Sequence, residues 1–220
     1  MKNLFLSCAM ACAAVFIGIN QTQAQNLKPR FGITAGADLT TLGKSAFESY
    51  QFDYRWRYGF QGGVYADLPL TNKISITPQV LYTQKGGQVD MGIPSYSIPD
   101  GAVSYDERYA GSARMNYIDI PVLFTYKPWS KLSIFAGPQV SFLLIQHSSY
   151  TDKRPLYPVY YFNNSRNGFT KTLVGGNVGI GYNYDRHLGF NFHYMADFQH
   201  IKAGATEKNS GFALTASYAF

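Results

Sequence analysis

The chain has 220 residues, of which 16% are aromatic and 15% charged, and its formal net charge is +6. This length suits a single domain, and the 21 glycines, 18 tyrosines and 16 phenylalanines favour strands over helices. The positive charges are spread along the chain and form no basic run, so composition gives no indication of nucleic-acid binding.

The N-terminus, residues 1–24, is predicted to be a secretory signal peptide. Lys2 precedes an apolar run over residues 4–19, and small residues then lead to an expected cleavage after Ala24. The mature domain would comprise residues 25–220. Both cysteines of the chain lie within the signal, so the exported domain offers no disulfide or thiol chemistry. Acylation of one of these cysteines, as in a lipoprotein, is the alternative interpretation.

Beyond the signal, no stretch reaches the roughly 20 apolar residues of a membrane-spanning helix. The sequence instead divides into segments in which apolar residues alternate with small or polar ones. In chain order these segments are residues 30–39, 56–68, 73–83, 113–126, 132–146, 170–184, 188–199 and 211–220. Each period of two predicts a strand, and an even number of strands lets both chain ends lie on one side of a membrane.

The connections between these segments alternate in length. Three are short turns, at residues 69–72, 127–130 and 185–187. Four are long, at residues 40–55, 84–112, 147–169 and 200–210. Short periplasmic turns and long external loops are typical of bacterial outer-membrane proteins. The pattern predicts an all-β fold, an eight-stranded antiparallel up-and-down transmembrane β-barrel in the cell outer membrane.

The direction of the apolar face separates two kinds of eight-stranded barrel. In a soluble lipocalin-like barrel this face would point inward and bind an apolar ligand. Here the opposite face is mostly small or polar, and aromatic residues collect near strand ends, so we expect the apolar face to contact outer-membrane lipid. The terminal Tyr218 and Phe220 resemble the signal by which the barrel-assembly machinery recognises its clients during biogenesis.

Two central segments resemble a known family. The sequence "YIDIPVLFTYKP" (residues 117–128) followed by "LSIFAGPQVSFLL" (residues 132–144) is similar to the paired strands of the PorT-like outer-membrane β-barrel proteins. Asp119 stands where that family usually has glutamate. The resemblance implies a small, porin-like outer-membrane barrel. Many members of that family have no assigned activity, and some assist a secretion machine, which makes a secretion-complex protein a possible partner.

Charged residues on the inward face are expected to form an internal network, because an isolated buried charge is costly. The members expected are Arg30, Asp38, Arg57, Asp67, Arg114, Asp119, Lys171, His193 and Asp197. Strand direction pairs Asp38 with Arg57 at the loop end and Arg30 with Asp67 at the turn end. Asp119 is expected to meet a cation or hydroxyl donors. Such a network would plug the barrel, and a narrow proton or solute path is the alternative.

No catalytic, metal-binding or cofactor-binding residues are predicted. The candidates near the loop ends, His147, Asp152, Asp197 and His200, lack the spacing of a nucleophile and its base. Enzymatic activity is therefore not expected.

The long loops are the predicted interaction surface. The loop at residues 147–169 is rich in tyrosine and arginine, which are enriched at binding hot spots. The expected contact residues are Arg154, Tyr157, Tyr160, Tyr161 and Phe162. We expect a non-catalytic barrel with a structural or surface-interaction role toward an extracellular partner. A narrow porin-like channel and a soluble lipocalin-like binder are the alternatives.

Overall fold

The computed structural model describes residues 27–47, 50–93, 107–152, 159–164 and 167–220. Its strands are β1 (Arg30–Thr41), β2 (Lys44–Phe47), β3 (Tyr50–Asp53), β4 (Arg57–Pro69), β5 (Ile74–Ile93), β6 (Glu107–Tyr126), β7 (Leu132–Asp152), β8 (Val159–Asn164), β9 (Thr172–Asn183), β10 (Leu188–Asp197) and β11 (Ser210–Ala219). The described residues contain no helix long and apolar enough to cross a membrane. The predicted signal peptide lies outside the described part of the chain.

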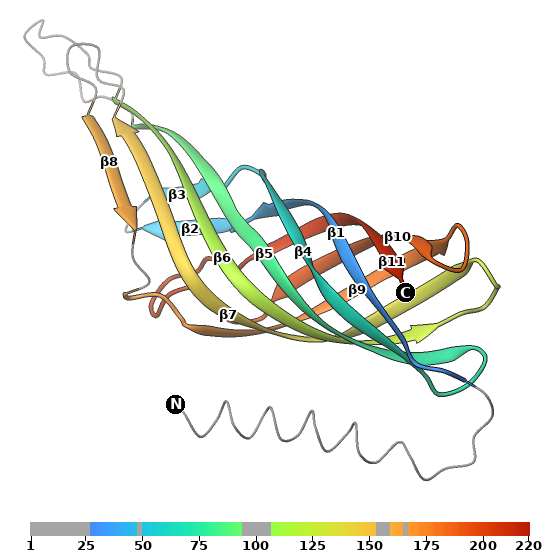
Figure 1. The fold of residues 1–220 in the computed structure, drawn as a ribbon. Coiled ribbons are helices and arrows are strands. Elements are labelled where there is room, and N and C mark those ends of the chain that lie inside the picture. The colour runs from blue at the N-terminus through green and yellow to red at the C-terminus, as the bar shows by residue number, and fades with distance from the viewer. Residues whose placement is uncertain (1–26, 48–49, 94–106, 153–158, 165–166) are drawn as a thin grey trace, which may run out of the picture.

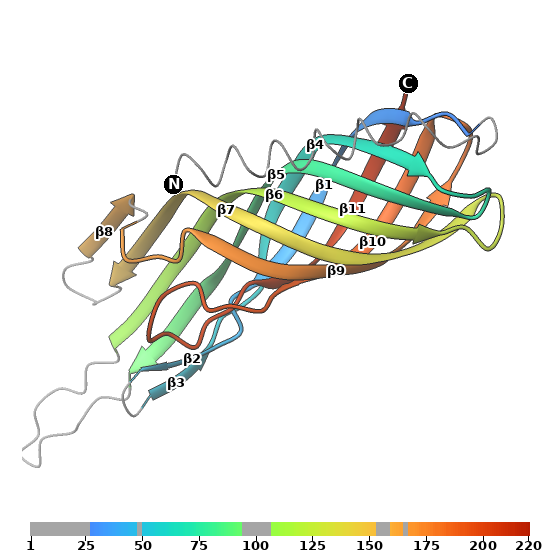
Figure 2. The same ribbon diagram turned by 90° about the horizontal axis from the view of Figure 1, so that it is seen from below.

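Eight of these strands close into an antiparallel barrel. Hydrogen-bonded neighbours follow the order β6, β5, β4, β1, β11, β10, β9 and β7, and β7 pairs with β6 to complete the ring. The first and last strands of the barrel are neighbours, with Ile33 opposite Tyr218. Figures 1 and 2 show the tilted strands around a common axis. The predicted eight-stranded up-and-down barrel is confirmed.

The large apolar side chains point away from the interior. Along β11, Phe212 and Leu214 are exposed whereas Ala213 and Thr215 are buried. Large apolar side chains are exposed in the same way around the barrel, and Ile180, for example, is 57% exposed. A protein surrounded by water would not leave so large an apolar surface uncovered. The outward apolar face fits lipid, and the lipocalin-like arrangement would require the opposite orientation.

The three central strands are longer than predicted. β5 and β6 have 20 residues each and β7 has 21, although a membrane crossing needs only about 9–11. Parts of residues 84–112 and 147–169, which we expected to be loops, are therefore strand. Polar Gln84 and Gln88 follow outward-facing Tyr82 along β5, so the apolar face ends while the strand continues. This ends the alternation on which the predicted strand boundary depended.

The excess length forms a sheet that projects from the loop end of the barrel. β5 pairs with β6 as far as Ile93 and Glu107, and β8 adds to β7 along residues 147–152. Figure 1 shows β8 and the adjoining end of β7 extending away from the barrel. The predicted first loop also contains regular structure, because β2 and β3 pair as a hairpin. We call the outer parts of β5, β6 and β7, together with β8, the projecting sheet.

Candidate functional site in the barrel interior

Lys85 lies in the middle of the interior, although its position was predicted to be in a loop. Its side chain is 1% exposed, and its Nζ atom lies 3.1 Å from Asp119 Oδ2 and 3.4 Å from Asp197 Oδ1. The ammonium group also donates to Ser141 Oγ at 3.1 Å and lies 5.1 Å from the centre of the Tyr117 ring. We call Lys85, Asp119 and Asp197 the ion cluster. It joins strands β5, β6 and β10 across the barrel.

Amide side chains complete the surroundings of both carboxylates. Gln139 Nε2 donates to Asp119 Oδ2 at 3.1 Å. Asn209 Nδ2 donates to Asp197 Oδ2 at 2.9 Å and to the Tyr117 hydroxyl at 3.3 Å. Each buried carboxylate therefore has a cation and an amide donor, which is the condition under which a buried ion pair is tolerated.

An apolar cluster fills the interior beside the ion cluster, on the loop side. It consists of Leu42, Ala113, Met115, Tyr117, Leu143, Leu173 and Ile201. Met115 and Leu173 have no exposed surface, and Leu42 has only 1%. Close packing of this kind leaves little room for a solute. Together the apolar cluster and the ion cluster close this part of the barrel.

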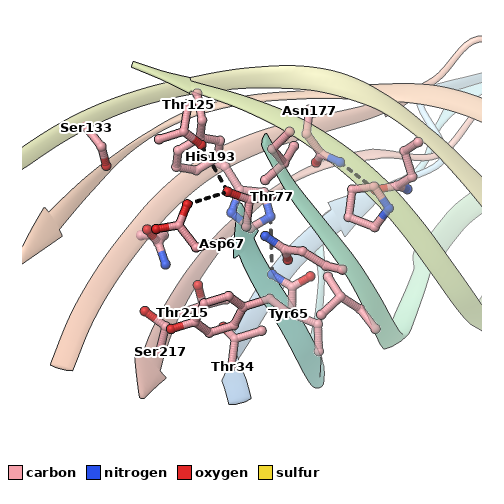
Figure 3. Close-up of a pocket in the computed structure, with 18 of the residues that line it drawn as sticks. Thr34, Tyr65, Asp67, Thr77, Thr125, Ser133, Asn177, His193, Thr215 and Ser217 are labelled. Atoms are coloured by element: carbon pink, nitrogen blue, oxygen red, sulfur yellow. Dashed lines mark hydrogen bonds between the residues drawn. The ribbon is translucent and has the colours of Figure 1, made fainter. Parts of the chain in front are cut away.

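A polar cavity of about 100 Å³ lies on the turn side of the ion cluster. Figure 3 shows its wall of hydroxyl and amide side chains, with Asp67 beside Thr77. Two cations share one carboxylate oxygen there, since Asp67 Oδ2 lies 2.7 Å from Arg30 and 2.9 Å from Lys127. His193 lines the same cavity and contacts Gln61, with 3.2 Å between His193 Nε2 and Gln61 Nε2. We call this space the turn-side cavity.

A second hollow, of about 500 Å³, lies at the loop end of β10, where Tyr194 and Ala196 line it. Its lining includes Lys44 and Lys208 together with Asp197 and Asn209. Gln139, which bonds to Asp119, lines the turn-side cavity instead. Tyr194, an exposed residue of the outward face, also lines the second hollow, so this hollow opens on the outside of the barrel wall and does not continue the turn-side cavity past the ion cluster. We call the second space the loop-end hollow.

Two of the expected interior placements need correction. Asp38 and Arg57 do not pair: both Asp38 oxygens and the Arg57 Nη1 are buried without a hydrogen-bond partner among the described residues. The register explains this, because Arg57 lies opposite Thr40 and is displaced along the strand from Asp38. Lys171 is exposed and precedes β9, so it does not face the interior.

The other expected interior residues have individual surroundings. Arg30 and Asp67, which we expected to pair, form the 2.7 Å contact at the turn end. Arg114 is half-buried, and its Nε atom has no hydrogen-bond partner among the described residues. Continued alternation from Thr83 to Lys85 was the signal that could have revealed Lys85, since Thr83 also points inward.

The expected loop contacts fall partly outside the described residues. Arg154 and Tyr157 lie outside the described residues, whereas Tyr160, Tyr161 and Phe162 belong to β8. These three positions are thus part of a strand and not of an irregular loop. Prolines and polar residues interrupt the alternation on either side of this strand, so the sequence pattern predicts a loop there.

The C-terminal pair lies at the seam between the first and last barrel strands. Tyr218 and Phe220 are 48% and 73% exposed, and their ring centres are 6.0 Å apart. The Phe220 backbone N–H donates to the Phe31 carbonyl at 2.9 Å. The terminal aromatic residue is therefore fixed by its backbone while its ring faces outward.

Two of the residues near the loop end have structural contacts. His200 Nδ1 contacts the Ala205 carbonyl, and Asp197 belongs to the ion cluster. Within the described ranges, no group of three or more histidine, cysteine or acidic side chains is placed to hold a metal ion.

Comparison with known proteins places the chain among outer-membrane barrels. The family described as outer membrane protein beta-barrel domain matches residues 21–202. A search of curated proteins finds no match.

Several solved structures are similar over most of the chain. Ail of Yersinia pestis, the attachment invasion locus protein, solved in complex with the heparin analogue sucrose octasulfate, is 12% identical, with 88% of this chain and 99% of that chain covered and a TM-score of 0.48. Neisserial surface protein A is 14% identical, with 86% and 97% covered and a TM-score of 0.48. The outer membrane protease OmpT of Escherichia coli is 10% identical, with 91% and 99% covered and a TM-score of 0.49.

Proposed function

Because the chain belongs to the outer membrane protein beta-barrel domain family, we propose that it is a non-catalytic surface protein that binds its partner through the projecting sheet. The barrel would hold this sheet in the outer membrane, with the loop end outside the cell. The partner would be an extracellular protein or a component of a membrane complex.

The observation that carries this proposal is the length of the central strands. β5, β6 and β7 are about twice as long as a membrane crossing requires. β8 extends the same sheet, so four strands stand beyond the lipid-facing band. A purely structural barrel has no need of this extension. Ordered strands also present a binding surface at lower entropic cost than irregular loops do.

The filled interior of the barrel supports a surface-binding role over a role as an open channel. The ion cluster and the neighbouring apolar cluster fill the interior on the loop side of the turn-side cavity. A porin-like function would require a continuous water path at this level. A porin-like channel is the second candidate, favoured by the polar turn-side cavity.

The narrower family assignment and the route of assembly belong to the same proposal. The motif at residues 117–128 supports a PorT-like protein, some of whose relatives assist a secretion machine. The exposed Tyr218 and Phe220 support recognition by the barrel-assembly machinery. The signal peptide, cleaved after Ala24, would direct export.

Site-specific photo-crosslinking on intact cells tests the surface role. A photoreactive amino acid would replace Tyr160 or Tyr161 in β8, and Tyr184 beside a short turn provides the matched control. We expect discrete crosslinked protein adducts from β8 and none of the same size from Tyr184. Adducts that are identical at all three positions, or no protein adduct from either β8 position, would refute a role for the projecting sheet.

A further inference from the structure

We propose that the loop-end hollow binds the headgroup of an anionic, phosphate-bearing lipid of the outer leaflet, with the acyl chains of that lipid lying on the aromatic surface beside the hollow. The site lies on the outer wall of the barrel, away from the projecting sheet, so it goes beyond the surface role. It rests on the proposed function only for the placement of the loop end outside the cell. The lipid would be held by charge at one end and by apolar contact at the other.

Aromatic rings on the outward face place the hollow at the membrane–water interface. Tyr194, which lines the hollow, and Trp56 both contact Phe212, with 5.1 Å and 5.9 Å between ring centres. Phe192 stacks on the same ring at 5.8 Å. We call these four exposed rings the aromatic patch. Tryptophan and tyrosine are enriched where the lipid headgroups begin. The hollow therefore lies at headgroup depth, and the aromatic patch beside it faces lipid.

A small residue in the outward row of β10 makes room for the hollow. The outward residues of this strand, with the first one beyond its end, are Phe190, Phe192, Tyr194, Ala196 and Phe198. Only a methyl group thus stands where the neighbouring positions carry rings, and this alanine lines the hollow. Gly43 leaves further space, because a Cβ atom at this position would meet no atom within 4 Å. The volume of about 500 Å³ is within the range of small-molecule sites.

Two lysines give the hollow a positively charged rim. Lys44 and Lys208 line it, both are exposed, and the described residues include no ion-pair partner for either ammonium group. Asp197, the acidic residue of the lining, is 4% exposed and is held within the ion cluster. Glu207 adjoins the rim, and its carboxylate accepts the backbone N–H of Thr206. Two ammonium groups against this one carboxylate leave a net positive charge, which attracts a phosphate group.

Hydrogen bonds hold the two lysines on anchored segments of the chain. The Lys208 backbone N–H donates to the Leu42 carbonyl at 3.2 Å. The Thr206 hydroxyl donates to the Lys44 carbonyl, also at 3.2 Å. These bonds tie the segment before β11 to the segment that follows β1. Cations on backbone that is already ordered bind an anion at lower entropic cost.

The rim and the aromatic patch together favour a lipid over a soluble anion. A free phosphate would contact the lysines alone, whereas a lipid would also cover the exposed rings of the aromatic patch with its acyl chains. The net charge of the rim favours a headgroup with a net negative charge over a zwitterionic one. The two requirements therefore define the ligand class as an anionic lipid with a phosphate in its headgroup.

Native mass spectrometry of the mature protein in detergent micelles tests this inference. The probes are dimyristoyl phosphatidylglycerol and dimyristoyl phosphatidylcholine, which share their acyl chains and differ in net charge. We expect the wild-type protein to retain one phosphatidylglycerol molecule more tightly than phosphatidylcholine. Lys44→Ala combined with Lys208→Ala should weaken phosphatidylglycerol binding by about tenfold or more. Lys73→Ala combined with Lys131→Ala removes the same charge beside two short turns and should bind as wild type.

A second variant tests the hollow without changing its charge. Ala196→Trp places a ring in the space and should weaken phosphatidylglycerol binding several-fold. Glycerol phosphate, which has the phosphate group without the acyl chains, should not displace the lipid even in large excess. Heat-dependent gel mobility establishes that each variant is folded.

Three results would overturn the inference. They are unchanged phosphatidylglycerol binding by the folded Lys44 and Lys208 variant, equal binding of the two lipids by the wild-type protein, and displacement of the lipid by glycerol phosphate. An equal loss of binding in the turn-side control would also contradict it, because the site would then not be at the loop end. None of these results affects crosslinking from β8, so the two proposals can fail separately.

Discussion

Lys85 shows at the level of a single residue how a buried charge organises the interior. The expectation that Asp119 meets a cation could be made from sequence, because an isolated buried carboxylate is unfavourable. The identity of that cation could not, since β5 was expected to end at residue 83. Asp38 illustrates the complementary difficulty. Alternation placed it inside the barrel, but its lack of a partner depends on register and side-chain direction.

Replacement of Lys85 by methionine should destabilise the barrel strongly. Lys85→Met retains a long apolar stem but leaves Asp119 and Asp197 without their shared cation. We expect a loss of about 3–5 kcal/mol in the free energy of unfolding, measured by urea titration in detergent micelles. Lys131→Met at the exposed turn should change it by less than about 0.5 kcal/mol. Equal effects of the two substitutions would contradict the role assigned to the ion cluster.

Asp38 and Asp119 should respond in opposite directions to the same substitution. Asp38→Asn removes a buried carboxylate that has no hydrogen-bond partner, so unfolding should be unchanged or require more urea. Asp119→Asn removes one half of a buried ion pair and should require less urea, by about 3 kcal/mol or more. A greater loss of stability from Asp38→Asn would show that Asp38 is paired in a way that its surroundings do not indicate.

Individual strands were predictable where one face contacts lipid and the other faces the interior. β1, β4, β10 and β11 begin and end close to the predicted boundaries for this reason. The outer parts of β5 to β7 were missed because an apolar outward face no longer accompanies the strand beyond the membrane. β8 was missed because prolines and polar residues interrupt the alternation on either side of it. Hydrogen bonding between backbones continues there without a hydrophobic pattern to reveal it.

The last strand should be the element most sensitive to C-terminal truncation. Deletion of Phe220 removes an exposed aromatic ring and a backbone contact to Phe31 at the seam of the barrel. We expect the variant to accumulate unassembled, with loss of the heat-dependent mobility shift and several-fold less protein in the outer membrane. Phe198→Ala, which removes an exposed ring at the loop end of β10, is the control. Normal assembly without Phe220 would refute the proposed assembly signal.

The turn between β9 and β10 should depend on pH through Asp185. The backbone N–H groups of Leu188 and His187 donate to its carboxylate and hold the pKa of Asp185 below its ordinary value of 3.8. Because the folded-state pKa is the lower one, this stabilisation is present above pH 3.8 and is lost as the pH falls through the lowered value. An NMR titration of the carboxyl group should show the lower pKa, and a pKa at or above 3.8 would contradict the described turn.

At the scale of the whole molecule, different parts of the outer surface face lipid and water. The apolar girdle faces lipid, and the projecting sheet continues into water from the same strands. The girdle and the number of barrel strands could be derived from composition and period. The closed interior and the ordered projection could not, because both depend on contacts between residues far apart in the sequence. Lys85 and Asp197, for example, are 112 positions apart.

The most direct measurement is the accessibility of the two barrel ends on intact cells. Single cysteines would be introduced by Gln88→Cys in the outer part of β5 and by Lys131→Cys beside a short turn, both exposed positions. A membrane-impermeant maleimide should label the first variant in intact cells and the second only after the outer membrane is permeabilised. Labelling in the reverse order, or equal labelling of both variants in intact cells, would contradict a membrane-embedded barrel whose projecting sheet lies outside the cell.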